Sequence, residues 1–288
     1  MGATPLLEDS MTLPETYAGL AGSPAIAPSG VIVVTGGAGQ GIGSGISRAL
    51  AAVGWTVAIA DRDISAARDV ARDMRSDGMD AHAVEIDVSD EESVARAFSR
   101  AIPELGSLRG LVNNAGVGLV KKLAEVSVPE WDLLHAVDLR GAFLCSRAAI
   151  PDIIRNGGGG IVNIGSVQAL GPHYGYSTYA AAKAGLIGLS RGIAADHGRD
   201  GIRCSIIHPG LVDSPQNREI FAAWGDPEEW IADYIGSRQM IPRLIRPDEV
   251  GAVAAFLLSD AGQSITATEI VIDGGSSRMA FDRTGDDE

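Results

Sequence analysis

A tyrosine and a lysine four residues apart are the strongest sign of chemistry in this sequence. Tyr179 and Lys183 have helical spacing within a stretch of small and apolar residues, 180–186. Residues four apart share one face of a helix, and an ammonium group there favours the phenolate form of a tyrosine, lowering its pKa from about 10. Such pairs also arise by chance, but the chain has only two other lysines, Lys121 and Lys122. Tyr179 is therefore a candidate general acid and base.

A serine stands at the end of an expected strand. Ser166 follows the apolar run Ile161–Ile164, and ligands of open α/β sheets bind at the carboxyl ends of strands. Its hydroxyl could bond a substrate oxygen, and a plain turn residue is the other interpretation. The surrounding Gly-Ser-Val lacks the G-x-S-x-G pattern of a hydrolase nucleophile. His173 and His208 have no acid spaced to complete a triad, so we expect them to be structural or to face the substrate.

A glycine-rich turn joins the apolar run Val31–Thr35 to an expected helix. It reads Gly36-Gly-Ala-Gly-Gln-Gly-Ile-Gly43. Glycines let backbone N–H groups approach a pyrophosphate, and a helix N-terminus adds the positive end of its dipole. A purely structural turn is the alternative, but the flanking strand and helix favour nucleotide binding. The expected contacts are Gly37, Gln40, Gly41, Ile42 and Gly43.

Acidic side chains end the next two expected strands. The carboxylate of Asp61 could accept both hydroxyls of an adenosine ribose and would repel a 2′-phosphate, which favours NAD over NADP. It could instead cap the next helix, as could Asp63. The adjacent Arg62 weakens the preference for NAD, because a guanidinium can pair with a phosphate. Asp87, followed by Val88, is expected to end the third strand at the adenine end of the crevice.

The elements that must position these residues alternate along the chain. Short apolar runs predict strands at 31–35, 56–60, 83–87, 110–113, 161–164, 203–207 and 269–272. Helical segments are expected between them at 43–53, 64–75, 91–102, 129–155, 177–196 and 247–259. Such alternation predicts parallel βαβ units wound right-handedly. The predicted fold is α/β, a doubly wound, Rossmann-type sheet of about seven strands with helices on both faces.

The length of 288 residues fits one such domain with terminal extensions better than two domains. Residues 1–29 carry four prolines and no sustained periodicity, which predicts a flexible extension. Residues 30–278 are the expected catalytic domain, and residues 279–288 an acidic tail. Within the domain, the irregular part 213–243 is expected to form a substrate lid.

Composition narrows the partners and the compartment. The net charge is −14, which argues against a nucleic-acid surface because such surfaces need clustered Lys and Arg. No apolar run approaches the roughly 18 residues that a membrane span needs. A signal peptide needs a basic residue near its start, and no basic residue precedes Arg48. Cys145 and Cys204 lack disulfide or zinc spacing, so no metal is expected. We expect a cytoplasmic protein without nucleic-acid or membrane partners.

Six motifs in a fixed order make the chain similar to the short-chain dehydrogenases/reductases. With the glycine turn these are Asn113-Asn-Ala-Gly116, Ser166, Tyr179-x-x-x-Lys183, Pro209-Gly210 and Asp273-Gly-Gly275. Ser166 precedes Tyr179 by 13 residues, the spacing that this family favours. The resemblance runs from Val31 to Ser276 and implies one Rossmann-type domain of about 250 residues.

The resemblance implies a role for each motif. Tyr179 would exchange a proton with an alcohol or carbonyl oxygen that Ser166 polarises, while Lys183 would hold the nicotinamide ribose. The hydride moves between nicotinamide and the substrate carbon. Tyr179 and Lys183 would thus also contact the cofactor. The resemblance adds to the cofactor site Asn114, Ala115, Gly116, Pro209, Gly210, Val212 and Ser214.

Three positions depart from the family pattern. The glycine turn has one extra residue between Gly36 and Gly41, so we expect a bulged turn that still binds pyrophosphate. Asp138 stands where the family usually has Asn, a residue that helps to hold a water joining Lys183 to solvent. We include it in the catalytic group, because an anion beside the ammonium would change the local titration. Ala267 replaces a usual Gly, which only reshapes a turn.

The segment between Ser214 and Arg243 is rich in aromatic residues. Members of the family close this segment over the substrate, and the aromatics would make an apolar lid. Packing within the lid or against another subunit is the alternative. We expect a small-molecule substrate, a cyclic or bulky, largely apolar secondary alcohol or ketone. Its expected contacts are Gln168, His173, Phe221 and Trp224.

The same segment is poor in basic residues. This disfavours phosphorylated and acyl-carrier substrates, although Arg218 and Arg238 leave room for one carboxylate. The resemblance further implies a homotetramer or homodimer formed through the helices at 129–155 and 177–196.

Three functions are compatible with the sequence. The leading one is an NAD-dependent alcohol dehydrogenase or ketone reductase. An NADPH-dependent carbonyl reductase is the first alternative. A nucleotide-sensing protein of the same fold without catalysis is the second, because Asp138 departs from the pattern. The complete set of Ser166, Tyr179 and Lys183 favours an enzyme.

Overall fold

The computed structural model describes residues 29–222 and 225–279. The expected N-terminal extension up to residue 28, the acidic tail from residue 280 and the predicted substrate contact Trp224 lie outside the described residues.

Across the described ranges, seven parallel strands form one sheet in the order β3-β2-β1-β4-β5-β6-β7. The strands are β1 (Val31–Thr35), β2 (Thr56–Asp61), β3 (Ala81–Glu85), β4 (Leu108–Asn113), β5 (Gly159–Ile164), β6 (Ile202–Pro209) and β7 (Glu269–Ile272). The strand order reverses direction between β1 and β4, which is where doubly wound sheets bind their ligands. The predicted fold class is confirmed.

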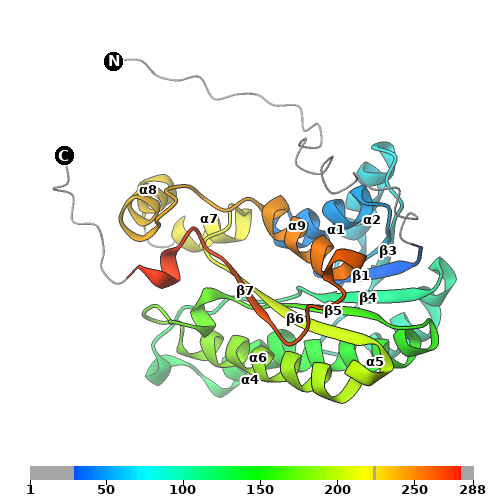
Figure 1. Ribbon diagram of the computed structural model, residues 1–288. Coiled ribbons are helices and arrows are strands. Elements are labelled where there is room, and N and C mark those ends of the chain that lie inside the picture. Colours follow the sequence, from blue (N-terminus) through cyan, green and yellow to red (C-terminus); the bar gives the residue numbers. More distant parts are fainter. Residues whose placement is uncertain (1–28, 223–224, 280–288) are drawn as a thin grey trace.

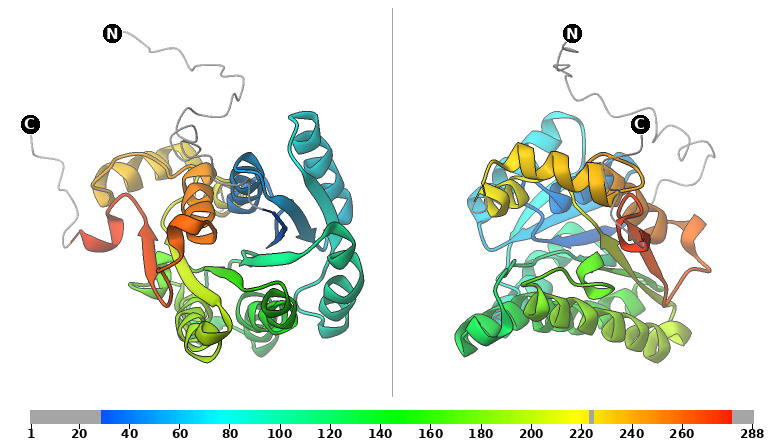
Figure 2. Two further views of the ribbon diagram at one scale, coloured as in Figure 1. Left: turned by 45° about the vertical axis from the view of Figure 1, so that its right-hand side comes forward. Right: turned by 90° about the vertical axis from the view of Figure 1, so that its left-hand side faces the viewer.

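Helices cover both faces of this sheet (Figures 1 and 2). One face carries α1 (Ile42–Ala52), α2 (Ile64–Ser76) and α9 (Pro247–Leu258). The other face carries α3 (Glu91–Arg96), α5 (Gly141–Arg155) and α6 (Ser177–His197), with α4 (Val128–His135) on the same side. Two further helices, α7 (Pro215–Ala222) and α8 (Pro227–Arg238), lie together at one end of the sheet.

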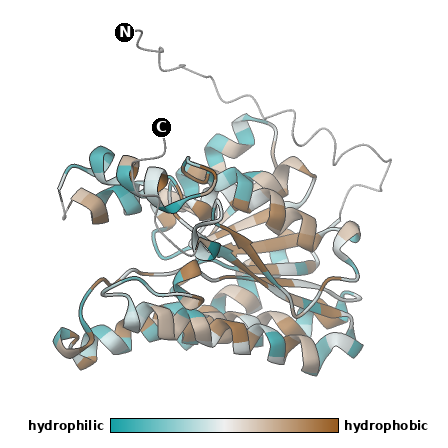
Figure 3. Ribbon diagram, turned by 60° about the vertical axis from the view of Figure 1, so that its left-hand side comes forward, coloured by the Kyte–Doolittle hydropathy of each residue, from teal (hydrophilic) through white to brown (hydrophobic). Residues whose placement is uncertain are grey.

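The first strand shows why the sheet is buried on both sides. Ile32 and Val34 face the layer of α1, α2 and α9, whereas Val31 and Val33 face the opposite layer, and all four are 0% exposed. A strand covered on both faces is apolar at every position. In Figure 3 the strands are accordingly mostly hydrophobic, while the helices carry hydrophilic stretches.

Two elements that carry site residues differ from their predicted form, and the helix expected at 91–102 also continues beyond α3 as a π-helical turn, Ala97–Ala101. β3 ends at Glu85, so Asp87 lies two residues beyond the strand and not at its end. The helix expected at 129–155 is divided into α4 and α5 by a π-helical turn, Ala136–Arg140. Such turns are rare and often occur at functional sites, and this one contains Asp138.

Candidate active site

A cleft of about 610 Å³ opens where the chain leaves the carboxyl ends of the strands. All of the described site residues predicted from the sequence line it, except Gly37. Gly37 is buried behind the turn, where a Cβ would lie 3.0 Å from Val34 O and 3.1 Å from a methyl group of Ile59. The neighbouring Gly36 lines the cleft in its place. The glycine turn thus lines the cleft through Gly36 and not through Gly37, and its contacts with a cofactor stay a prediction.

The glycine turn leaves no room for side chains at its closest approach. Gly36 has a φ of +63°, and a Cβ on Gly43 would lie 2.1 Å from Gly36 O. Asn114 holds the turn by donating from Nδ2 to Thr35 O at 2.9 Å and to Gly36 O at 3.0 Å. Gly41 is the N-cap residue of α1, and no side chain of the described residues forms a capping hydrogen bond there. This cradle of backbone N–H groups at a helix N-terminus fits the pyrophosphate of a dinucleotide.

Asp61 lies at the cleft, and Asp63 caps the helix. The Asp63 side chain accepts from Ala66 N at 3.0 Å at the start of α2. The Asp61 carboxylate accepts from Ala38 N at 3.2 Å and from Asp63 N at 3.1 Å, which ties the glycine turn to the end of β2. Asp61 and the exposed Arg62 both line the cleft. An adenosine ribose fits beside this carboxylate.

Lys183 is buried beside Tyr179, as their spacing on α6 predicted. Its Nζ lies 5.5 Å from the centroid of the Tyr179 ring and donates to Ile164 O at 3.1 Å. It also forms an ion pair of 3.2 Å with Oδ2 of Asp138. Burial opposes the positive charge, but Asp138 and Tyr179 outweigh it and raise the pKa of Lys183 above its ordinary value of 10.5. The side chain therefore remains an ammonium group at neutral pH.

Asp138 joins three parts of the site. It is 1% exposed, and the π-helical turn carries it to the base of the cleft. Its Oδ1 accepts from Val117 N at 2.8 Å, and its Oδ2 faces Lys183. A Cβ on Gly116 would lie 3.1 Å from Asp138 Oδ2 and 3.4 Å from Lys183 Nζ. The ion pair therefore lies directly under the backbone that lines the cleft.

Three tyrosines line the cleft, but their surroundings differ. Burial raises the pKa of Tyr176 to about 12, and it also raises the pKa of Tyr234. Both phenols therefore stay protonated. Tyr179 alone among these three lies over the Lys183 ammonium. The sequence did not assign Tyr176, although its position three residues before Tyr179 places it on the same helix face; the ring centroids are 6.0 Å apart.

Ser166 lies at the start of the turn that follows β5. It is 9% exposed, and its Oγ accepts from Gln168 N at 3.2 Å. Gln168 Oε1 accepts in turn from His173 N at 2.7 Å. His208 is structural and does not face the substrate: it is fully buried and absent from the residues that line the described cleft.

Aromatic rings stack along α7 and α8, which lie in the segment 213–243 that the sequence predicts to be a lid. Phe221 and Trp230 have ring centroids 4.1 Å apart, and Trp230 and Tyr234 have centroids 5.3 Å apart. His173 adds a contact of 5.9 Å with Tyr234. All four line the cleft, yet Phe221 and Tyr234 are only 3% and 5% exposed. The rings thus pack against one another and also line the cleft, while closure over a substrate stays a prediction.

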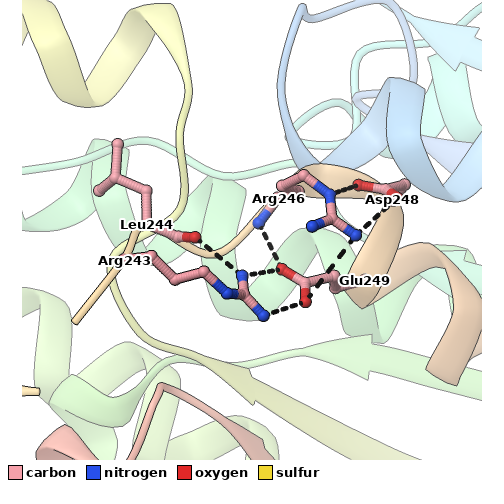
Figure 4. Close-up of polar contacts among 5 residues, drawn as sticks. All are labelled: Arg243, Leu244, Arg246, Asp248 and Glu249. Carbon is pink, nitrogen blue, oxygen red and sulfur yellow. Dashed lines mark hydrogen bonds and ion pairs between the residues drawn. The ribbon is translucent and has the colours of Figure 1, made fainter. Parts of the chain in front are cut away.

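The end of the lid is anchored to α9 (Figure 4). Arg243 donates to both carboxylate oxygens of Glu249 at 2.8 and 2.7 Å, and Arg246 N donates to Glu249 Oε2 at 2.8 Å. Arg243 lowers the pKa of Glu249 by this hydrogen bonding. Val212 and Ile245 form a parallel β-bridge where the lid leaves and rejoins the body. The predicted lid segment is therefore held where it meets the body of the domain.

The arginine considered for a substrate carboxylate is already engaged. Arg218 pairs with Asp213 at 3.0 Å and with Glu228. Arg238 is exposed on α8 and is not among the described residues that line the cleft, whereas Glu219 is. Lys183 and Arg62 are the Lys and Arg side chains in the described lining. The expectation of room for one carboxylate is therefore not supported by the positions of these arginines.

The described ranges contain neither a helix that could span a membrane nor a cluster of metal ligands. No described helix is both long and apolar enough to cross a membrane. No three His, Cys, Asp or Glu side chains within 29–222 and 225–279 gather as a metal site would require.

Comparison with known proteins shows to which family this chain belongs. A family model described as enoyl-(acyl carrier protein) reductase matches residues 37–277. Cis-4-hydroxycyclohexanecarboxylate dehydrogenase of Sinomonas cyclohexanicum is 39% identical over 246 residues, which cover 85% of this chain and 95% of that protein. Meso-2,3-butanediol dehydrogenase of Serratia marcescens is 37% identical over 247 residues, covering 86% and 94%.

A solved structure extends the likeness to three dimensions. The gluconate 5-dehydrogenase from Burkholderia cenocepacia, solved in complex with NADP and tartrate, superposes with a TM-score of 0.81 at 30% identity. The match covers 87% of this chain and 96% of that one. The resemblance drawn from the motifs is confirmed. The chain belongs to the short-chain dehydrogenase/reductase family and is an NAD(P)-dependent oxidoreductase that acts on CH–OH groups.

Proposed function

We propose that this protein transfers a hydride between NAD and the carbon of a neutral, bulky secondary alcohol or ketone, with Tyr179 as general acid and base. One observation carries the proposal. Tyr179, Lys183 and Ser166 line one cleft between the glycine turn and the aromatic lid. A reacting oxygen at that point can meet a phenol and a hydroxyl while its carbon faces the cofactor.

Lys183, Tyr179 and Ser166 have different roles in the proposed proton transfer. Lys183 stays an ammonium because Asp138 and Ile164 O hold it, and its Nζ lies 5.5 Å from the centroid of the Tyr179 ring. In oxidation Tyr179 takes the proton of the alcohol, while the Ser166 hydroxyl donates a hydrogen bond to the substrate oxygen. In reduction the proton moves back. The bound nicotinamide supplies or accepts the hydride.

The cleft favours a neutral substrate over an anionic one. Arg218 is engaged by two acids, and Glu219 adds a carboxylate to the lining. The stacked rings of Phe221 and Trp230 offer an apolar wall, which suits a ring or a bulky alkyl group. Relatives at similar identity act, by name, on a diol and on a hydroxycyclohexanecarboxylate; both are secondary alcohols, and the second is an anion, so the preference for a neutral substrate rests on the lining of this cleft. We assign this chain a neutral secondary alcohol.

The ribose end favours NAD. A 2′-phosphate beside the Asp61 carboxylate would be repelled, whereas ribose hydroxyls would be accepted. The alternative is an NADPH-dependent carbonyl reductase. Two observations favour it: Arg62 is exposed at the same edge of the cleft, and the gluconate 5-dehydrogenase structure contains NADP.

We further propose a homotetramer or homodimer formed through α4, α5 and α6. Trp131, Leu133 and Phe143 are exposed apolar side chains on α4 and α5. On α6, a Cβ on Gly188 or Gly192 would meet no described atom within 4 Å, which leaves a small-residue surface for close packing. Light scattering should give the mass of two or four chains. The mass of one chain would contradict this proposal.

The proposed organisation of the chain is a catalytic domain at 30–278 with a lid at 213–243. We place the enzyme in the cytoplasm, because the two cysteines of the chain, Cys145 and Cys204, are buried free thiols that suit a reducing compartment. Burial raises the pKa of both to about 12, so they are unreactive.

A substrate panel tests the proposed reaction. Cyclic and open-chain secondary alcohols, their ketones and their carboxylated analogues are assayed with NAD and with NADP by nicotinamide absorbance. We expect turnover of neutral cyclic members with NAD, and kcat/KM lower by about tenfold for matched carboxylates, as one unfavourable charge contact predicts. Preference for NADP would favour the carbonyl reductase. Tight NAD binding without turnover of any member would overturn the proposed reaction in favour of nucleotide sensing.

A further inference from the structure

A fully buried histidine lies directly behind Ser166. His208, near the end of β6, has its Nδ1 at 3.2 Å from Ser166 N and 3.0 Å from Ser166 O. Its Nε2 lies 3.2 Å from Oε2 of Glu269 on the neighbouring strand β7. The other oxygen of Glu269 accepts from Arg191 on α6 at 2.5 Å. The imidazole thus connects the serine backbone to a carboxylate held at the edge of the sheet.

The surroundings of the His208 ring determine its charge and its tautomer. Burial is the largest influence on His208 and lowers its pKa below 6.5; Ser166 and Glu269 act in the opposite direction, and Lys183 adds to the lowering. The ring is therefore neutral at pH 7. A carboxylate can only accept, so the proton of the neutral ring lies on Nε2. The lone pair of Nδ1 then accepts the N–H of Ser166. Ser166 O, 3.0 Å from Nδ1, would instead take a proton from an Nδ1–H tautomer, but that tautomer would set the Nε2 lone pair against the Glu269 carboxylate.

The imidazole ring of His208 packs tightly against the backbone of Gly165. A Cβ on Gly165 would lie 2.5 Å from His208 Nδ1 and 2.8 Å from its Cε1. Only a glycine allows the imidazole to lie directly against the backbone that carries Ser166. Movement of the ring would therefore move the serine.

We propose that Glu269 and His208 form a positioning pair: Glu269 fixes the tautomer of His208, and His208 fixes the backbone of Ser166 so that its hydroxyl meets the substrate oxygen. This inference rests on the proposed reaction, in which Ser166 polarises that oxygen. His208 is not among the described residues that line the cleft, so it acts through Ser166. It is a positioning residue.

Two variants of His208 separate its two contacts. In His208→Asn the amide lies near the position of Nδ1, so its oxygen can accept from Ser166 N while Glu269 loses its partner. In His208→Gln the amide reaches the position of Nε2, so the contact with Glu269 stays and the contact with Ser166 is lost. We expect His208→Gln to lower kcat by about 10- to 100-fold with KM and the Kd of NAD within about twofold, because misplacing a polarising group acts on the chemical step. We expect His208→Asn to keep kcat within about threefold.

The matched controls are His82→Asn and His82→Gln. His82 also pairs with an acid, Asp80 at 2.8 Å, but it is on the surface of β3. Neither control should change kcat. Equal losses of kcat in the two His208 variants, or a loss in KM alone, would overturn the positioning role.

A second measurement needs no turnover. Nitrogen NMR of the wild-type ring should show the Nε2–H tautomer near pH 7, and amide hydrogen exchange at Ser166 should be faster in His208→Gln than in His208→Asn. Glu269→Gln, a change at a partly exposed residue, should leave both tautomers populated and speed the exchange at Ser166. An Nδ1–H tautomer in the wild type, or equal exchange in all variants, would overturn the inference. If the NMR and exchange results are as expected but no alcohol is turned over, the proposed reaction has failed and the link from Glu269 to Ser166 stands.

Discussion

The two ends of the cleft are built by different means. At the cofactor end, backbone atoms and glycines make the surface, and a Cβ on Gly43 would lie 2.1 Å from a carbonyl oxygen. At the lid end, stacked side chains make the surface, and a Cβ on Gly236 in α8 would meet no described atom within 4 Å. A surface made of backbone suits one constant ligand, whereas a surface made of side chains can change with a single substitution.

Among the changes that compare the two ends, the largest effect is expected at the glycine turn. Gly43→Ala must displace Gly36 O and Asn114, so we expect the Kd of NAD to rise by more than about 100-fold. Calorimetric titration measures this loss. The matched control is Gly236→Ala in the lid, which should leave the Kd unchanged. Unchanged cofactor binding in Gly43→Ala would remove the distinction between the two ends.

The ion pair between the two ends is expected to contribute to stability. The pKa of Lys183 is raised above 10.5, so the pair stabilises the fold at neutral pH, and this contribution is lost as the pH rises through the folded-state pKa of Lys183. Asp138→Asn should therefore lower the free energy of unfolding by about 2 kcal/mol at pH 7, because it leaves a buried ammonium without its anion. Urea unfolding measures the difference, which should narrow above pH 10.5. Equal stability at pH 7 would contradict the assignment.

A smaller effect is expected in the lid. Trp230→Ala removes two ring contacts, each worth about 0.5–1.5 kcal/mol, so KM for the alcohol should rise by about tenfold while the Kd of NAD stays constant. Steady-state kinetics and titration measure the two constants. Tyr174→Ala is the control, since Tyr174 is exposed, its ring contacts Lys122 and it does not line the described cleft. A parallel rise in the Kd of NAD would mean that the two ends are not independent.

The smallest effect is expected at Asp61. Asp61→Asn removes the charge but keeps an oxygen that can accept from Ala38 N. The preference for NAD over NADP should fall by about fivefold, the size of one screened charge contact. The ratio of kcat/KM for the two cofactors measures it. An unchanged ratio would assign cofactor choice to another residue.

The sequence predicted those parts of the site that depend on local spacing. Ser166 and the glycine turn follow strands, and the carboxyl ends of parallel strands meet at one edge of a sheet. Tyr179 and Lys183 share one helix face because residues four apart lie on the same side of a helix. The fold was predictable too, because strands buried on both faces are apolar runs that stand out between helices.

The parts that depend on distant side chains were not predictable. His208 and Glu269 are 61 residues apart, and only the pairing of β6 with β7 brings them together. Arg218 was considered free for a carboxylate because nothing in the spacing showed its pairing with Asp213 and Glu228. The π-helical turn at Asp138 has no local sequence signal of its own.

The central claim is that Tyr179 carries out acid–base chemistry in a cleft that binds the cofactor by other means. The direct test is Tyr179→Phe, with Tyr174→Phe at an exposed position as the control. We expect Tyr179→Phe to lower turnover by about 100- to 10,000-fold with the Kd of NAD within about threefold. Turnover equal to that of the wild type would contradict the account.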